Sequence, residues 1–284
     1  MENCIIKIDG REIPFSYNWV FGKYGKHIIK YSFNNLLTYT NNLFRNCEYL
    51  ISLDLSNFNT VNTKSMRGMF CECRSLIILH LSNFNTINTI YMSEMFASCS
   101  SLTSLDLSNF ITQNVIDMSE MFAFCSSLTS LDLTNFITQN VIDMSRVFHS
   151  CRSLTSLDLS NFITTKVTNM RQMFALCESL ISSDLSKFNT INVMNMESMF
   201  MRCKSLKNLD LSNFNTINVT NMIEMILCCK SLKYLDLSNF NTKNATKMKN
   251  IFLECKSLKL NKVKINKEKN ILLHGRILFF LKNN

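Results

Sequence analysis

Glycine, proline, tryptophan and histidine are scarce in this 284-residue chain, which has 5 glycines, 1 proline, 1 tryptophan and 4 histidines. So few glycines leave little material for a loop that cradles phosphate. The histidines, which are His27, His80, His149 and His274, are scattered and form no catalytic cluster. We therefore expect a protein that is not an enzyme and that carries no cofactor.

Long apolar runs are also missing. None approaches the roughly 18 residues that a membrane-spanning helix needs. Residues 1–10 lack a basic segment followed by a long apolar run, so no secretory signal is predicted. These absences predict an intracellular protein, in which the 12 cysteines are expected to be free thiols.

The chain does contain a strict repeat. Nine cysteines recur every 26 residues, namely Cys47, Cys73, Cys99, Cys125, Cys151, Cys177, Cys203, Cys229 and Cys255. One phenylalanine column runs in the same register from Phe58 to Phe240, and a second runs from Phe44 to Phe252 with Ile226 filling one place. A constant period without insertions predicts a solenoid of stacked coils of equal length.

Each unit combines two periodicities. Residues 53–56 alternate apolar and polar, which is typical of a short strand. Within residues 66–73, Met66, Met69, Phe70 and Cys73 have the spacing of one face of a helix of about two turns. The pairs Asp117–Glu120, Asn169–Gln172 and Asn221–Glu224 have the spacing of a helix capping box. The pattern predicts an α/β solenoid, with a parallel sheet of short strands on one face and short helices on the other.

The segment Leu50-x-x-Leu53-x-Leu55 and its copies match the leucine-rich-repeat core. The longer unit, as in residues 99–110, resembles the BspA-type leucine-rich repeats of bacterial surface lipoproteins. The resemblance covers roughly residues 38–260. One departure is Phe58 and its column, which stand where many leucine-rich repeats carry a buried asparagine. The resemblance implies a binding or adhesion surface, and the missing export signal weighs against adhesion.

Three regions follow from this pattern: an N-terminal cap at 1–37, a solenoid of about eight units at 38–260, and a C-terminal cap or basic tail at 261–284. The cap is expected to contain a hairpin that turns at Asp9-Gly10. Residues 27–32 fit a degenerate first strand of the solenoid. The apolar segment 271–281 is expected to fold over the last coil as a lid; an amphipathic membrane-contacting tail is the alternative.

The polar columns of the unit also receive structural interpretations. The cysteine column would bring thiols into the disulfide range, but its apolar position favours buried free thiols. Its spacing lacks the paired pattern of zinc sites. The asparagine columns that begin at Asn57 and Asn62, and the threonine column from Thr60 to Thr242, are expected to hydrogen-bond to neighbouring backbone.

Outward-facing side chains of the strand segments form the first candidate site. The central column, here called the aspartate row, consists of Asp54, His80, Asp106, Asp132, Asp158, Asp184, Asp210 and Asp236. Strands about 4.8 Å apart would bring these carboxylates side by side, so the row would attract a basic peptide or weakly bind a metal. The alternative is structural: the flanking serines donate hydrogen bonds to the carboxylates, and duplication copied the arrangement.

The second candidate site is basic. Residues 1–199 carry a net charge of −2, and residues 200–284 carry +11. Six lysines at equivalent repeat positions, here called the lysine cluster, are Lys204, Lys207, Lys230, Lys233, Lys256 and Lys259. Such a patch would suit acidic lipid, nucleic acid or an acidic protein, whereas solubilising charge is the simpler interpretation.

Two functions remain open from the sequence. The chain is either a protein-interaction scaffold that uses the aspartate row, or a binder of acidic membrane or nucleic acid that uses the lysine cluster. The first is favoured, because an acidic face would repel polyanions. Phosphate-type binding would weaken steeply with salt, which separates the two.

The phenylalanine column predicts a buried spine, so its truncation should be costly. We expect Phe136→Ala, in the middle of the stack, to lower the free energy of unfolding by about 3–5 kcal/mol in denaturant titrations. A loss below roughly 1 kcal/mol would contradict a buried spine.

Overall fold

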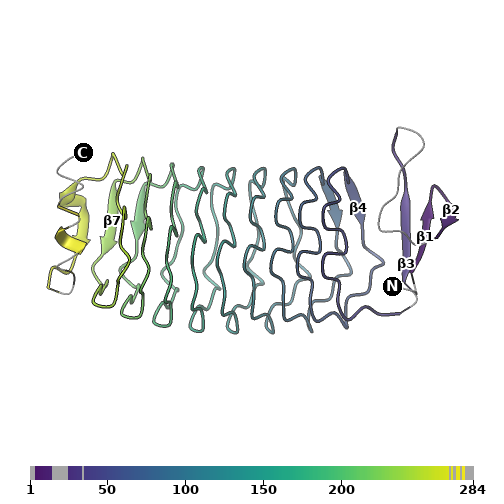
Figure 1. Cartoon of the computed structure of the whole chain (residues 1–284), viewed down its shortest axis with the longest axis horizontal. Coiled ribbons are helices and arrows are strands. Elements are labelled where there is room, and N and C mark those ends of the chain that lie inside the picture. Colours follow the sequence, from purple (N-terminus) through teal and green to yellow (C-terminus); the bar gives the residue numbers. More distant parts are fainter. Residues whose placement is uncertain are drawn as a thin grey trace.

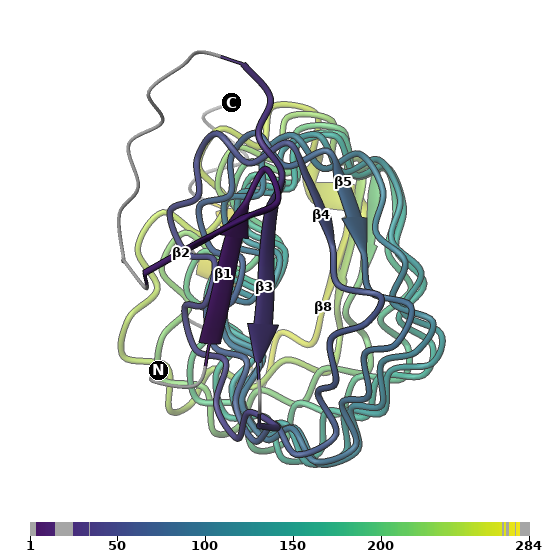
Figure 2. The ribbon, with the colours of Figure 1, turned by 90° about the vertical axis from the view of Figure 1, so that its right-hand side faces the viewer.

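The computed structural model describes residues 4–14, 25–33, 35–268, 270, 273–275 and 277–278. These residues form a rod of stacked coils, with the N-terminal and C-terminal segments at opposite ends (Figure 1). Viewed along the rod, the coils superimpose closely, and strands β1 and β3 cross the N-terminal end (Figure 2). The solenoid predicted from the 26-residue period is therefore present.

An antiparallel sheet of order β2-β1-β3 forms the N-terminal end. Its strands are β1 Cys4–Ile8, β2 Arg11–Ile13 and β3 Ile29–Phe33. The hairpin predicted at Asp9-Gly10 is confirmed, because β1 and β2 pair across it. The assignment of 27–32 as a solenoid strand is wrong, since β3 pairs antiparallel with β1. Rings of β3 instead pack on the first coil: Tyr31 lies 5.9 Å from Phe44, and Phe33 lies 5.5 Å from Phe58.

Short parallel strands form two separate sheets along one side of the coils, here called the strand face. They are β4 Ser52–Asp54, β5 Ile78–His80, β6 Asn208–Asp210, β7 Tyr234–Leu237 and β8 Val263–Ile265. β4 pairs with β5, and β6, β7 and β8 pair in that order. In the described coils between β5 and β6 the same segments are extended but form no strand. The predicted continuous sheet is therefore interrupted in its middle.

The predicted helical face is wrong. Across residues 35–268 the described helical structure is one 3-10 helix, η1 Leu260–Lys262. Residues 273–275 and 277–278 are helical near the C-terminal end. The segments that resemble helices in sequence, such as 66–73, are series of tight turns. The chain is thus a solenoid of strands and turns, and not an α/β repeat.

Backbone hydrogen bonds explain why these turns stack. In the second coil, the N–H groups of Met66, Gly68 and Phe70 donate to carbonyls of the next coil at 2.8–2.9 Å. N–H groups of intervening residues close turns within their own coil; the Met69 N–H, for example, donates to the carbonyl of Met66. The same alternation recurs from coil to coil, together with parallel bridges from Tyr39↔Ser65 to Asn221↔Lys247. We call this side of the rod the turn face.

Left-handed backbone interrupts any helix on the turn face. Each coil has two positive-φ residues four positions apart, and the second coil has Gly68 (φ 60°) and Glu72 (φ 63°). The non-glycine members are Asn42, Asn46, Glu72, Glu94, Ser98, Glu120, Phe124, Arg146, Ser150, Gln172, Leu176, Ser198, Arg202, Glu224, Cys228, Asn250 and Glu254. Because left-handed φ for L residues costs about 1–2 kcal/mol each, inter-coil hydrogen bonding must hold these positions in place.

The supposed capping boxes take part in this different geometry. Oδ1 of Asp117 accepts the N–H of Ser119, two residues on, and Asn169 and Asn221 do the same for their own neighbours. Glu120, the expected partner of Asp117 in a cap, has φ 57°. The spacing of a helix start therefore marks a side-chain turn here.

One continuous apolar core runs through the coils from Phe44 to Ile277. Phenylalanine rings stack along it in two columns, which confirms the predicted spine. Ring centroids lie 5.4–6.0 Å apart in the column beside the turn face, which begins at Phe44. They lie 6.1–6.5 Å apart in the column that begins at Phe58, on the strand side. The rings are thus spaced more widely on the strand side of the core than beside the turn face.

Polar columns link successive coils. Each buried cysteine from Cys73 to Cys255 donates its thiol to a carbonyl of the preceding coil, as Cys151 does to Phe122 at 3.1 Å. Thr112 Oγ1 donates to the carbonyl of Ile137 and accepts the N–H of the same residue. Asn140 donates to the carbonyl of Gln113. The predicted structural roles of these columns are confirmed, and the described cysteines are free thiols.

The C-terminal end closes the core at least in part. β8 pairs in parallel with β7, which places Val263 beside Leu235 and Ile265 beside Leu237. Leu273 and Ile277 are buried in the core, which agrees with a lid. The remaining positions of the predicted lid, 271, 272, 276 and 279–281, lie outside the described residues.

Removing left-handed strain should stabilise the stack. Arg202 is exposed, has φ 60° and makes no ion pair with another described residue. We expect Arg202→Gly to raise the free energy of unfolding by about 0.5–1 kcal/mol, because glycine adopts this φ at no steric cost. Urea unfolding measures the change.

Lys230 supplies the matched control, since it is exposed and lies outside the positive-φ positions. Lys230→Gly should lower the free energy of unfolding by roughly 0.5–1 kcal/mol. Equal losses in both variants would contradict the proposed strain.

Candidate functional site

The aspartate row lies on the strand face, where alternate side chains of each extended segment point outward. Leu105 and Leu107 face the core on either side of Asp106, and this arrangement repeats from coil to coil. In the register of the sheets, Asp54 lies beside His80, and Asp210 lies beside Asp236. The structure therefore brings these members of the row together as neighbours in successive coils. All members are exposed except Asp236, which is 5% exposed.

Each carboxylate is oriented by the backbone that follows it. Oδ1 of Asp132 accepts the N–H of Thr134 at 3.0 Å and its hydroxyl at 2.7 Å. In the other aspartates, too, Oδ1 accepts the backbone N–H of the residue two positions on. These aspartates are Asp54, Asp106, Asp158, Asp184, Asp210 and Asp236. The structural alternative for the row expected flanking serine hydroxyls as donors. The donor at each of these aspartates is instead the backbone N–H of the residue two positions on, and the Thr134 hydroxyl adds a second bond to Asp132.

These hydrogen bonds favour the ionised form of three central members of the row. Donation from the backbone N–H, and then from the hydroxyl, of the residue two positions on lowers the pKa of Asp106, Asp132 and Asp158 below the usual 3.8. Neighbouring Asp184 and Asp132 act in the opposite direction on the pKa of Asp158, because like charges repel. The face therefore combines fixed carboxylate orientation with mutual repulsion that a cation would relieve.

One member of the row already holds a cation. Lys264 of β8 reaches Oδ2 of Asp236 at 3.4 Å, and its ammonium lies 5.4 Å from the centre of the Tyr234 ring. The Tyr234 hydroxyl donates to the same Oδ2 at 3.0 Å. Along the described residues, the aspartates from Asp54 to Asp210 have no lysine or arginine within 4.0 Å. Oδ1 of Asp236 thus accepts a backbone hydrogen bond, while Oδ2 forms the ion pair with Lys264.

A hollow of about 270 Å³ lies on the same face. Asp106 and Asp132 line it, together with Thr134, Asn135 and residues 105 and 107–108. It opens in the part of the stack where the coils form no strand pairing. A basic side chain entering it would lie beside two carboxylates.

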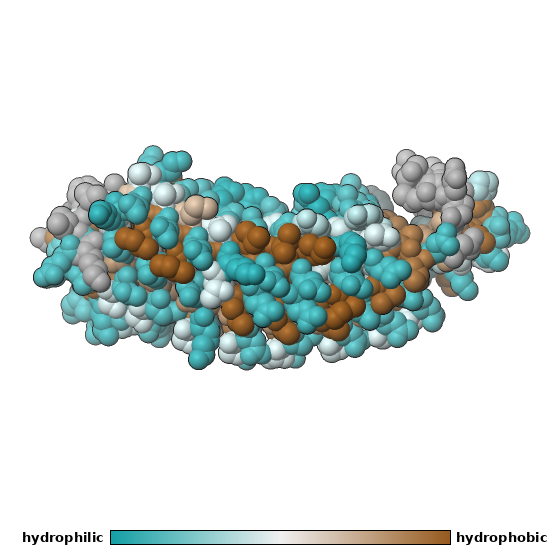
Figure 3. All heavy atoms as spheres, turned by 90° about the horizontal axis from the view of Figure 1, so that it is seen from below, coloured by the Kyte–Doolittle hydropathy of each residue, from teal (hydrophilic) through white to brown (hydrophobic). Residues whose placement is uncertain are grey.

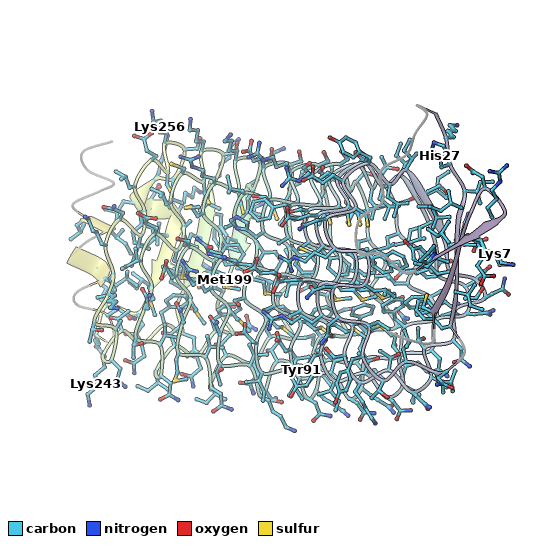
Figure 4. The ribbon with its side chains drawn as sticks, turned by 45° about the vertical axis from the view of Figure 1, so that its right-hand side comes forward. Lys7, His27, Tyr91, Met199, Lys243 and Lys256 are labelled. Atoms are coloured by element: carbon cyan, nitrogen blue, oxygen red, sulfur yellow. The ribbon has the colours of Figure 1, made fainter. Side chains whose placement is uncertain are left out.

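The lysine cluster lies on other columns, near the C-terminal end. Its members are exposed, and backbone bonds such as Lys233 N–H to the Lys207 carbonyl join their coils. Lys256, at the upper edge of the rod in Figure 4, pairs with Glu254 at 3.0 Å, and Lys204 pairs with Glu178 at 2.7 Å. The other four have no carboxylate of the described residues within 4.0 Å.

Comparison with known proteins identifies the repeats. The model of the family described as "Mycoplasma protein of unknown function, DUF285" matches residues 38–156, 104–183 and 178–271. The chain belongs to the DUF285 family. The three overlapping matches agree with a repeat protein whose repeats fill the solenoid. No match is found among curated proteins.

For this DUF285 chain, two further findings bear on the candidate sites. No helix within the described residues is long and apolar enough to cross a membrane. Over the same residues, no group of three or more histidine, cysteine, aspartate or glutamate side chains could hold a metal ion. The weak metal binding considered for the aspartate row therefore has no structural support.

The structure also shows surface features that sequence reasoning missed. Ile111, Ile137 and Ile163 are 37–44% exposed and occupy one column in three successive coils. Lys243, which stands two residues after the same column in a later coil, lies at the lower edge of the rod (Figure 4). Figure 3 shows apolar patches on this lower face. The signal in the sequence was a change in that column from Asn85 to isoleucine and back to Asn189.

The aspartate row should make stability depend on pH. A carboxylate whose pKa is lowered by folding stabilises the native state above its unfolded pKa and loses that contribution as pH falls through the folded pKa. We expect the free energy of unfolding of the wild type to fall as pH drops below 3.8. The triple variant Asp106→Asn, Asp132→Asn, Asp158→Asn should fall less, because asparagine keeps the acceptor but does not titrate.

Denaturant unfolding of both proteins between neutral pH and pH 2 measures this difference. If the unfolding free energies of the two proteins fall in parallel through the acid range, the hydrogen bonds at the row do not lower the pKa of these carboxyl groups.

Proposed function

We propose that this chain is a non-enzymatic protein-interaction solenoid, and that its strand face binds a basic segment of a protein partner through the aspartate row. The observation that carries the proposal is the pairing of Asp236 with Lys264. This contact is an internal example of a lysine bound to the row without loss of the backbone bond to Oδ1.

Repetition extends that contact along the rod. The six aspartates without a cation partner among the described residues present the same oriented carboxylate. A partner segment with several lysines or arginines would engage successive coils, and each ion pair would relieve repulsion between neighbours. The hollow between Asp106 and Asp132 gives one basic side chain a recessed position. Rim-type charge pairs of this kind contribute more to encounter rate and specificity than to affinity.

We also infer kinship with the BspA-type repeats. The support is the shared L-x-x-L-x-L core, whose leucines face the interior of the coil. The kinship concerns the repeat unit and its strand segment, since the turn face of this chain lacks the helices expected from the resemblance.

A second candidate function is binding of an acidic membrane or nucleic acid by the lysine cluster. It is favoured by Lys207, Lys230, Lys233 and Lys259, which are exposed and have no acidic partner among the described residues. The aspartate row on the strand face would repel the same polyanion.

Co-purification from the native cell context tests the first function against the second. The wild type would be compared with the triple variant Asp106→Asn, Asp132→Asn, Asp158→Asn and with the matched triple variant Lys207→Gln, Lys230→Gln, Lys233→Gln. We expect a protein partner that the wild type and the lysine variant retain and the aspartate variant loses.

The retained partner should then be released by moderate salt, since surface ion pairs are screened. Identical partners with the wild type and the aspartate variant would refute the first function. Nucleic acid or lipid that is lost only from the lysine variant would establish the second.

A further inference from the structure

A second hollow, of about 380 Å³, lies at the edge where the turn face meets the start of the strand segments. It is lined by Arg74, Ser98, Ser100, Phe124, Ser126, Ser150 and Arg152. These residues belong to four successive coils and to two columns, one just before and one just after the repeated cysteine. Lys256, at the upper edge in Figure 4, is a later member of the second column.

The hollow exists because long side chains are missing from two coils. The column after the cysteine reads Glu48, Arg74, Ser100, Ser126, Arg152, Glu178, Lys204, Lys230 and Lys256. Only Ser100 and Ser126 are short, so they leave a gap about two coils, or roughly 10 Å, wide. Arg74 and Arg152 bound that gap on either side.

The hollow is positively charged. Its lining has two arginines and no carboxylate. Arg74 pairs with Glu72 at 3.0 Å and with Glu48 at 3.8 Å, and neither carboxylate belongs to the lining. Arg152 is exposed, and within the described part of the chain no carboxylate lies within 4.0 Å of it. A guanidinium without an acid partner beside a hollow is a ready site for an anionic group.

Hydroxyl groups line the floor, and one of them lacks a partner. Ser100 and Ser126 donate to backbone carbonyls of the preceding coil. Ser150 is 2% exposed, and its Oγ has no hydrogen-bond partner among the described residues. Buried hydroxyls are normally bonded, so a ligand in the hollow would supply what Ser150 lacks.

A single aromatic ring interrupts this polar lining. Phe124 is 44% exposed and occupies a column that holds Ser98 and Ser150 in the neighbouring coils. His149 holds it edge-on, with ring centroids 4.9 Å apart. His149 also breaks its own column, where Ala123 and Ala175 stand on either side. The hollow is therefore a unique place in an otherwise uniform stack.

We propose that this hollow binds a small anionic sugar, such as a sugar phosphate or a sugar acid. Arg152 would take the anionic group, because, of the two lining arginines, it is the one without an acid partner among the described residues. The serines would exchange hydrogen bonds with sugar hydroxyls, since a hydroxyl both donates and accepts. The ring of Phe124 would cover the C–H face of the sugar, whose slightly positive hydrogens suit the negative face of an aromatic ring.

Isothermal titration with defined probes tests the proposal. Glucose 6-phosphate and glucuronate have both an anionic group and a sugar ring. Inorganic phosphate has only the anionic charge, and glucose has only the sugar ring. We expect at least one anionic sugar to bind more tightly than inorganic phosphate and glucose. Binding by inorganic phosphate that equals the best sugar would overturn the proposal, and so would no binding by either anionic sugar.

Variants chosen from the column itself locate the site. Ser126→Glu fills the hollow with a residue that the column already accepts at Glu48 and Glu178, and it should abolish binding. Arg152→Gln should weaken binding by roughly tenfold to hundredfold, which is typical for loss of a hydrogen bond to a charged group. Arg202→Gln removes the same charge from the column before the cysteine, two coils beyond the hollow and outside the lysine cluster, and the affinity of this variant should equal that of the wild type.

The ring has its own test. Phe124→Ser should keep the left-handed backbone, since Ser98 and Ser150 adopt it at φ 60–61° in the adjacent coils. It should weaken binding of the anionic sugar and leave binding of inorganic phosphate unchanged. Equal losses of affinity from Arg152→Gln and Arg202→Gln would refute the site. Thermal unfolding of each variant checks that a lost affinity does not reflect a lost fold.

Discussion

The architecture depends on the hydrogen-bond ladder of the turn face. There, alternate N–H groups donate to the next coil and others close turns within their own coil, so the turn face is hydrogen-bonded without a helix. This alternation requires two left-handed residues per coil. It also points Met66, Phe70 and Cys73 inward, where they stack on their copies. Phenylalanine rings are closer together beside this ladder than on the strand side, where strands pair only toward the two ends of the stack.

Particular residues show which parts of this fold can be predicted from the sequence and which cannot. The 26-residue period determines the stacking, the phenylalanine spine, and the inward cysteines, because each concerns which residues are buried. It did not reveal the conformation of 66–73. Met66, Met69, Phe70 and Cys73 have helical spacing, yet a series of turns buries the same four positions. No glycine marks the left-handed positions apart from Gly68, so the usual signal for such backbone is missing.

The candidate sites show the same division. The aspartate row was predictable as a surface column, since outward positions alternate with inward leucines. Its backbone bonds, and the pairing of Asp236 with Lys264, depend on turn geometry and on the two-residue offset of β8, which the repeat register does not show. The hollow beside Arg152 arises from the absence of long side chains in two coils. A reader of the sequence sees such a gap only after the columns are aligned and compared member by member.

The ladder also gives the rod an electrical direction. Most of its inter-coil N–H groups point toward the C-terminal end, as those of Met66, Gly68 and Phe70 do, and a smaller number, such as the Ile116 N–H that donates to Ile90, point the other way. Each peptide group has a dipole of about 3.5 D, so the excess of groups that point toward the C-terminal end leaves a net dipole along the axis, whereas strand dipoles in an ordinary sheet largely cancel. The positive end coincides with the +11 charge of residues 200–284. Backbone and side chains thus polarise the molecule in the same sense, and an approaching ion meets two electrically different ends.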